Sequence, residues 1–159
     1  MEAIEDGWWY SVILPDLRLV VAFKTDADLY KAASKTLPNY WQLQLRKTIH
    51  TKSRIRRSEQ LPDPIVVAAN SSRLNTSIGK NWLAVGDSAI AFDPLSAQGV
   101  HKALDSGLRA AQSIEDHWSG DDFALHDYAY DVDHRFRSYL RLREAYYTQE
   151  KRWSDSTFW

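Results

Sequence analysis

The stretch NWLAVGDSAIAFDPLSAQGVHKALDSG, from Asn81 to Gly107, decides how the chain is interpreted. Its first part is apolar and ends at Gly86-Asp87, which predicts a short buried strand followed by a sharp turn. From Gly99 onward, small and apolar residues recur at helical spacing, which predicts a helix. A carboxylate at the end of a strand accepts hydrogen bonds from sugar-like hydroxyls, and the free N–H groups of a helix N-terminus favour an electron-rich oxygen. Together these features predict a site for a ligand with a polyol chain and an acidic ring.

A slightly longer stretch, WLAVGDSAIAFDPLSAQGVHKALDSGLRAA (residues 82–111), resembles the second flavin-binding motif of the FAD-dependent monooxygenases and halogenases with the para-hydroxybenzoate hydroxylase fold. In that motif a Gly-Asp pair is followed by a proline loop and a helix that begins at glycine. The resemblance implies that Asp87 holds the ribityl hydroxyls of FAD, next to a turn at Gly86. It also implies that four residues line the flavin ring: Pro94, Gln98, Gly99 and Val100. It assigns no catalytic residue.

The remaining sequence predicts an α+β architecture. Residues 8–14 and 17–25 are rich in β-branched and aromatic side chains on either side of a Pro-Asp turn, which predicts a hairpin. Helices are expected from Asp26 to Pro38, over 39–57, from Gly99 to Trp118 and over 123–152, and a further strand over 64–75.

By the resemblance, the chain divides into three segments. We expect residues 1–78 to form part of an antiparallel substrate-domain sheet with helices. Residues 79–120 would be the strand-loop-helix that completes the FAD site, and residues 121–159 a long C-terminal helix.

Composition restricts the class of protein. The formal net charge of -1 argues against a dedicated nucleic-acid or membrane-surface protein. The basic run over 46–57 admits a phosphate contact, but such runs are usually solvated helix surfaces. The chain has no cysteine, which excludes disulfides and zinc-thiolate sites. The N-terminal residues show neither a signal peptide nor a membrane span, so a cytoplasmic protein is expected.

Two other kinds of site are weighed and set aside. Ser88 is a poor candidate nucleophile, because Ile90 stands where a nucleophile elbow requires glycine. The residues His126, Asp127, Asp131 and His134 have a spacing compatible with metal ligands. Alternating acids and bases on a helix are usually a solvated surface, so we expect no metal site.

The resembled family binds the ADP half of FAD through a Gly-rich turn, and no Gly-x-Gly occurs in this sequence. We therefore expect the C-terminal part of an FAD-dependent oxidoreductase, inactive in isolation. The expected reaction is monooxygenation of a small organic substrate, with NAD(P)H as electron donor. Halogenation is disfavoured, because residues 8–15 (WWYSVILP) match the halogenase Trp-x-Trp-x-Ile-Pro signature poorly.

The expected partner is the missing N-terminal half or a second copy of the chain. We expect no binding to nucleic acid or to a membrane. The alternative is a non-catalytic interaction module, or a split subunit, that keeps the fold without the cofactor.

Overall fold

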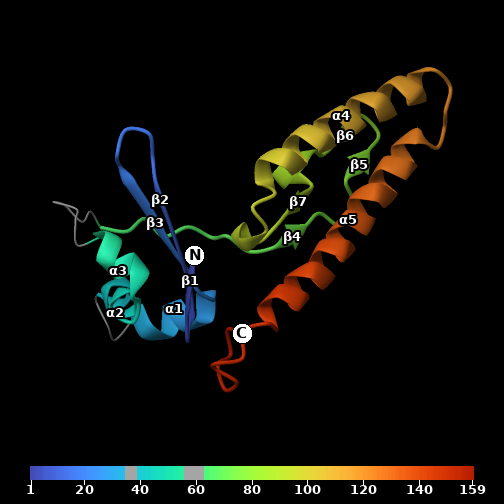
Figure 1. Ribbon diagram of the computed structural model, residues 1–159. Helices are drawn as coiled ribbons and strands as arrows, with labels where there is room; N and C mark the ends of the chain where they lie inside the picture. The colour runs from blue at the N-terminus through green and yellow to red at the C-terminus, as the bar shows by residue number, and fades with distance from the viewer. Residues whose placement is uncertain (35–38, 56–62) are drawn as a thin grey trace. The chain divides into compact units, whose positions relative to one another are not determined.

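The computed structural model describes all residues except 35–38 and 56–62 (Figure 1). Helices and small antiparallel sheets make up the chain, and a long helix lies near its C-terminus, which confirms the predicted α+β class. The chain divides into two compact units. One contains residues 1–67 and 148–159, and the other contains residues 68–147.

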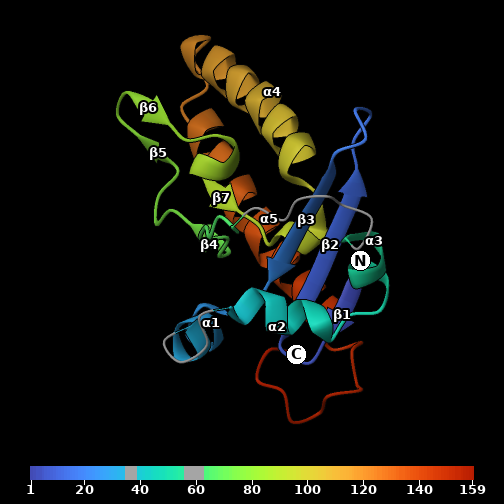
Figure 2. The ribbon, with the colours of Figure 1, turned by 90° about the vertical axis from the view of Figure 1, so that its left-hand side faces the viewer.

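The first unit contains a three-stranded antiparallel sheet in the order β1 (Glu2–Ile4), β2 (Gly7–Ile13), β3 (Leu19–Lys24), shown face-on in Figure 2. The predicted hairpin is confirmed as β2 and β3, and its turn places Leu17 at a φ of 67°. Gly7 is required at the start of β2: a Cβ there would lie 2.1 Å from the carbonyl oxygen of Lys24.

Three helices accompany this sheet: α1 (Ala27–Ser34), α2 (Tyr40–Arg46) and α3 (His50–Ile55). The prediction of one continuous helix over 39–57 is wrong, and the far ends of both predicted helices lie outside the described residues. The carboxylate of Glu2 accepts hydrogen bonds from the N–H groups at the start of α3. These bonds satisfy N–H groups that would otherwise continue the α2 ladder, so a new helix begins there.

The core of the first unit is built around the indole of Trp9, which is 1 % exposed. This ring stacks on Phe23 with 4.8 Å between ring centroids. The C-terminal segment belongs to the same unit: Ser156 donates to the carbonyl of Glu5, and Trp159 donates to the carbonyl of Ile4.

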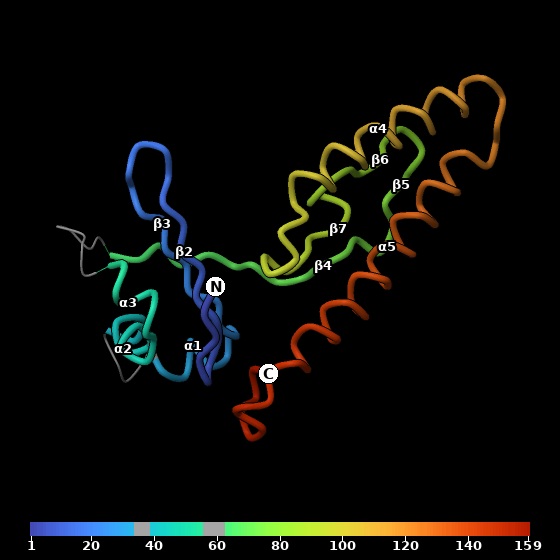
Figure 3. The backbone as a smooth tube through the Cα atoms, viewed as in Figure 1, coloured from blue at the N-terminus to red at the C-terminus, as the bar shows by residue number. Residues whose placement is uncertain are grey.

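In the second unit, α4 (Gly99–Trp118) and α5 (Ala124–Tyr147) run side by side as a helical hairpin (Figures 1 and 3). Two short ladders lie against it: β4 (Ser72–Arg73) with β7 (Ile90–Ala91), and β5 (Ile78–Gly79) with β6 (Trp82–Leu83). The buried core residues of this unit are Ala84, Ala89, Ile90, Ala110, Tyr128 and Val132. Within the described ranges, no helix is both long enough and apolar enough to cross a membrane.

The two strands predicted after residue 63 are both shorter than expected. In the predicted strand over 64–75, only β4 forms, and Ile65 is 90 % exposed. The expected buried strand before Gly86 is reduced to β6, where Trp82 is 50 % exposed. Asp87 therefore lies in a 3-10 turn, η1 (Gly86–Ser88), after a two-residue strand.

Candidate functional site

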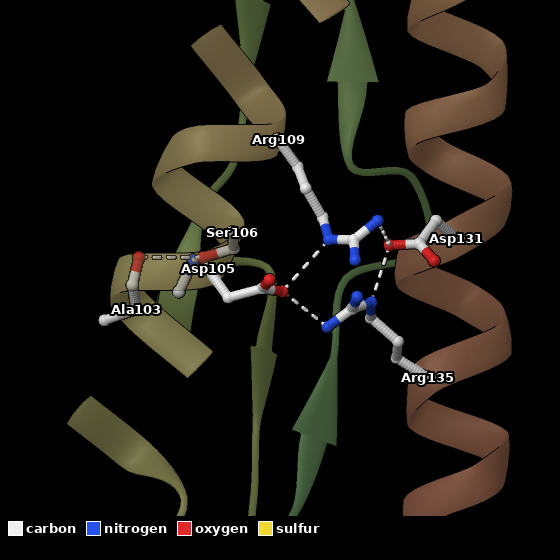
Figure 4. A network of polar contacts seen from close by, with 7 residues as sticks. Ala103, Asp105, Ser106, Arg109, Asp131 and Arg135 are labelled. Carbon is white, nitrogen blue, oxygen red and sulfur yellow. Dashed lines mark hydrogen bonds and ion pairs between the residues drawn. The ribbon is translucent and has the colours of Figure 1, made fainter. Parts of the chain in front are cut away.

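The turn at Gly86 is fixed to the first half of α4. Gly86 has a φ of 59°, a left-handed conformation that glycine adopts without steric cost. Its N–H donates to the hydroxyl of Ser106 over 2.9 Å, and that hydroxyl donates to the carbonyl of Ala103 (Figure 4). These bonds hold the residue that follows, Asp87, beside α4.

The side chain of Asp87 is 74 % exposed, but one of its carboxylate oxygens is paired with a buried lysine. Oδ1 lies 2.5 Å from Nζ of Lys102, whose side chain is only 6 % exposed. The same ammonium donates to the carbonyl of Ile90 and lies 4.4 Å from the ring centroid of Phe92. Oδ2 of Asp87 accepts no hydrogen bond from the described part of the chain. The carboxylate thus presents one uncommitted oxygen to its surroundings.

The proline loop is anchored by Asp93, which is 4 % exposed. Its Oδ1 accepts from the N–H of Leu95 over 2.8 Å, and its Oδ2 accepts from the hydroxyl of Tyr147 over 3.0 Å. The N–H of Asp93 donates to the hydroxyl of Tyr139 over 2.7 Å. Both tyrosines lie on α5, so this helix sets the position of the short 3-10 helix η2 (Pro94–Ser96).

The N-terminus of α4 follows directly from this loop. Ala97 adopts a left-handed φ of 51°, and Gln98 precedes the helix without capping it through its side chain. In the described chain, the N–H groups of Gly99, Val100 and His101 have no acceptor. A Cβ added at Gly99 would meet no atom within 4 Å. This helix end is open to an external acceptor.

The structure thus places the residues named from the sequence on one continuous segment. Gly86 and Asp87 are joined to α4 through Ser106 and Lys102, and Pro94 lies in the loop that enters the same helix. An uncommitted carboxylate oxygen and three free N–H groups fit a ligand with hydroxyl donors and an electron-rich ring edge. The pattern of the site therefore agrees with a flavin.

Two supporting residues, Asp93 and Lys102, were missed in the sequence. Asp93 carried a signal, because an Asp-Pro dipeptide is typical of a turn that the aspartate side chain closes. Nothing in the sequence indicated a buried role for Lys102, because a lysine on a helix is nearly always solvated.

A network of two carboxylates and two guanidiniums joins α4 to α5 (Figure 4). Asp105 lies 3.0 Å from Arg109 and 2.6 Å from Arg135, and Asp131 lies 2.6 Å from Arg135. Burial raises the pKa of Asp105, but the hydrogen bond and charge of Arg109 and the charge of Arg135 outweigh it, and the net pKa is lowered. An adjoining cavity of about 10 Å³ holds at most one water, so it is no cofactor site.

The alternative sites gain no support from geometry. The hydroxyl of Ser88 donates to the carbonyl of Val85 over 2.7 Å. The carboxylate of Asp131, weighed as a metal ligand, is instead paired with Arg135. No group of three or more metal-binding side chains occurs among the residues that the structure describes.

No family model matches this chain, but curated proteins and solved structures do. LodB of Marinomonas mediterranea, described as a FAD-dependent oxidoreductase, is 28 % identical over 160 residues, covering 100 % of this chain and 42 % of that protein. The structure of the peptidyl tryptophan dihydroxylase QhpG superposes with a TM-score of 0.83 at 23 % identity, covering 99 % of this chain and 38 % of QhpG. The flavin-dependent halogenase CmlS gives a TM-score of 0.72 at 23 % identity, over 87 % of this chain and 25 % of CmlS.

These matches confirm the resemblance to the FAD-dependent oxidoreductases and flavin-dependent halogenases. The two structural matches show that the fold is shared. The chain spans less than half the length of each of these relatives.

Proposed function

We propose that this chain supplies the strand-loop-helix part of the FAD site of a flavin-dependent oxidoreductase. Two observations carry the proposal: Asp87, which is bound to Lys102 in the first turn of α4, has an uncommitted oxygen, and the N-terminus of the same helix is open. Asp87 would hold the ribityl hydroxyls. The N–H groups from Gly99 onward would face the electron-rich edge of the ring, with Pro94, Gln98 and Val100 beside it. Gly86 permits the turn that places the carboxylate.

The physical basis is charge. FAD, when bound, supplies the redox chemistry, and its reduced ring carries negative charge that a helix N-terminus stabilises. The chain's own residues bind and orient the cofactor. We extend the proposal to monooxygenation of a small organic substrate with NAD(P)H as electron donor. No catalytic residue is assigned.

The rest of the site would come from outside this chain. The relatives are more than twice as long, and no Gly-x-Gly turn for the ADP half is present. The exposed side of α4 supports this view, because it is apolar: Val100, Leu104, Leu108 and Trp118 are 77 %, 67 %, 76 % and 83 % exposed. We call these four residues the α4 stripe.

The opposite side of α4, which packs against α5, carries polar residues such as Lys102 and Asp105. A helix normally buries its apolar side, so the α4 stripe is the side expected to be covered. We propose that the remaining part of the flavoprotein covers it, or a second copy of the chain when that part is absent.

The test of the flavin role is Asp87→Asn in the flavoprotein that contains this chain. The change keeps the shape and leaves an amide oxygen for Lys102, but it replaces the free carboxylate oxygen by a donor. A charge-assisted hydrogen bond contributes about 1.5–3 kcal/mol, so FAD affinity should fall by about 10-fold or more. The dissociation constant is measured by quenching of flavin fluorescence.

Asp105→Asn is the matched control, because it makes the same chemical change in the ionic network on the other side of the turn. It should lower the thermal midpoint and leave FAD affinity unchanged. If Asp87→Asn binds FAD as tightly as the wild type, the proposed role of Asp87 is wrong.

A further inference from the structure

Lys102 is an unusual residue for the inner side of a helix. Its side chain is 6 % exposed, and lysine is rarely buried unless its charge is paired. Its ammonium has three partners: the Asp87 carboxylate, the Ile90 carbonyl and the Phe92 ring. All three lie in the segment 87–92, immediately before the proline loop. The lysine therefore ties the first turn of α4 to the proposed ribityl-binding carboxylate.

The pair is strongly asymmetric in exposure. Lys102 is enclosed, whereas the Asp87 side chain is 74 % exposed and would sample several rotamers if it were free. Its Oδ1 is held 2.5 Å from the ammonium, which selects one orientation. That orientation leaves Oδ2 without a partner in the described chain. The buried ammonium of Lys102 thus determines which oxygen of Asp87 is free to bind a ligand, and in which orientation.

We propose that Lys102 is a positioning residue for the flavin: it does not contact the cofactor, but it fixes the Asp87 carboxylate in the orientation that receives the ribityl hydroxyls. The inference rests on the proposed function and goes one step further, because it assigns a role to a residue to which the resemblance gives none. Pre-organisation of this kind strengthens binding by removing the entropy cost of ordering the side chain at the moment of association.

A purely structural role for Lys102 makes a different forecast. If Lys102 only fastens α4 to residues 87–92, its replacement would lower the thermal stability of the fold. Any change in FAD affinity would then be the same whether or not residue 87 carries a carboxylate. A lysine that acts through Asp87 affects FAD only while that carboxylate is present. A double-mutant cycle separates these cases.

The cycle compares wild type, Lys102→Met, Asp87→Asn and the double variant in the flavoprotein that contains this chain. Two quantities are measured: the FAD dissociation constant and the thermal midpoint of the apo-protein. Methionine keeps the length of the buried stem and removes the charge. Lys102→Met should weaken FAD binding by roughly 2- to 10-fold, as expected for freeing one side chain. In the Asp87→Asn background the same change should leave FAD affinity unaltered.

Arg135→Met is the control, because it also removes a cation that joins α4 to the rest of its unit. It should lower the midpoint without changing FAD affinity. Should Lys102→Met not give folded protein, Lys102→Gln, which retains a donor towards Ile90, takes its place in the cycle with the same expected results.

The outcomes are distinct. An equal loss of FAD affinity from the Lys102 change in both backgrounds overturns the positioning role. So does unchanged affinity in Lys102→Met, and in that case a weakened Asp87→Asn still supports the proposed function. If Asp87→Asn itself has no effect, the flavin role of Asp87 and the inference built on it both fail.

Discussion

The hydroxyl of Tyr147, at the end of α5, should contribute to the stability of the proline loop. The hydroxyl of Tyr147 donates a hydrogen bond of 3.0 Å to Oδ2 of Asp93. The other oxygen of that carboxylate accepts a hydrogen bond from the N–H of Leu95 inside the loop. The variant Tyr147→Phe removes only this donor. The aromatic ring, which lies 5.2 Å from the guanidinium of Arg143, is kept.

The size of the effect follows from burial. Asp93 is 4 % exposed, so water cannot readily replace the lost donor. Arg143 lies 3.9 Å from the same oxygen, too far for a hydrogen bond, and offers only partial compensation. A hydrogen bond to a charged group contributes about 1.5–3 kcal/mol, and we expect a loss of about 2 kcal/mol. For a chain of this length that corresponds to a fall in the thermal midpoint of about 4–8 °C.

The control is the neighbouring residue: Tyr146→Phe makes the same chemical change on a side chain that is 61 % exposed. Thermal unfolding by circular dichroism should show the fall only for Tyr147→Phe. Amide hydrogen exchange should show faster exchange at Leu95, whose acceptor has been loosened. Equal midpoints for the two variants, with unchanged exchange at Leu95, would refute the idea that the Tyr147 hydroxyl anchors the loop.

Two further predictions concern the surface of α4 and the N-terminal strand. Replacing Leu104 and Leu108 of the α4 stripe by Glu should reduce self-association of the isolated chain, measured by sedimentation. A wild-type chain that stays monomeric at high concentration would contradict the proposed covering of the stripe. Burial raises the pKa of Glu2, but hydrogen bonds from the N–H groups of Ile49, Thr51 and His50 outweigh this effect, and the net pKa is lowered. The Glu2 carboxylate therefore stabilises the fold fully at pH values above the ordinary pKa of glutamate. This stabilisation is lost as the pH falls through the lowered pKa. Glu2→Gln should therefore cost about 1 kcal/mol at neutral pH and nothing in acid, measured by denaturant unfolding at both pH values, and an equal cost at the two would contradict it.

The sequence predicted elements better than it predicted their surroundings. The helix beginning at Gly99 is confirmed at both ends, because a glycine, a periodic apolar side and a following Gly120 are local signals. A periodic apolar side is usually buried, yet Leu104 and Leu108 are exposed. Periodicity tells which side of a helix is to be covered, but it does not say whether the same chain covers it.

The strand predicted over 64–75 shows the same limit. Its apolar, β-branched run has the propensity for a strand, but Ile65, Val66 and Val67 are 90 %, 58 % and 74 % exposed and no ladder forms on them. Strand propensity largely reflects packing against neighbouring strands, so it is not realised where the neighbour is missing. The flavin motif was recognisable because its signal is sequential, whereas the support from Lys102 depends on a contact across 15 positions of the chain that no spacing rule predicts.

The two groups of charged residues that contact α4 differ in whether they leave a carboxylate oxygen without a partner in the described chain. In the network of Figure 4, Asp105 and Asp131 each face both guanidiniums, so the charges are balanced within the chain and no ligand is needed to complete them. The pair of Lys102 and Asp87 is balanced in charge, but it leaves an exposed carboxylate oxygen unused. A solvated oxygen costs nothing without a ligand and gains a charge-assisted hydrogen bond when a hydroxyl arrives. We therefore expect the ligand to bind near the first turn of α4, which carries Lys102 and the free N–H groups, and not at the middle of the helix, where the ionic network is already closed.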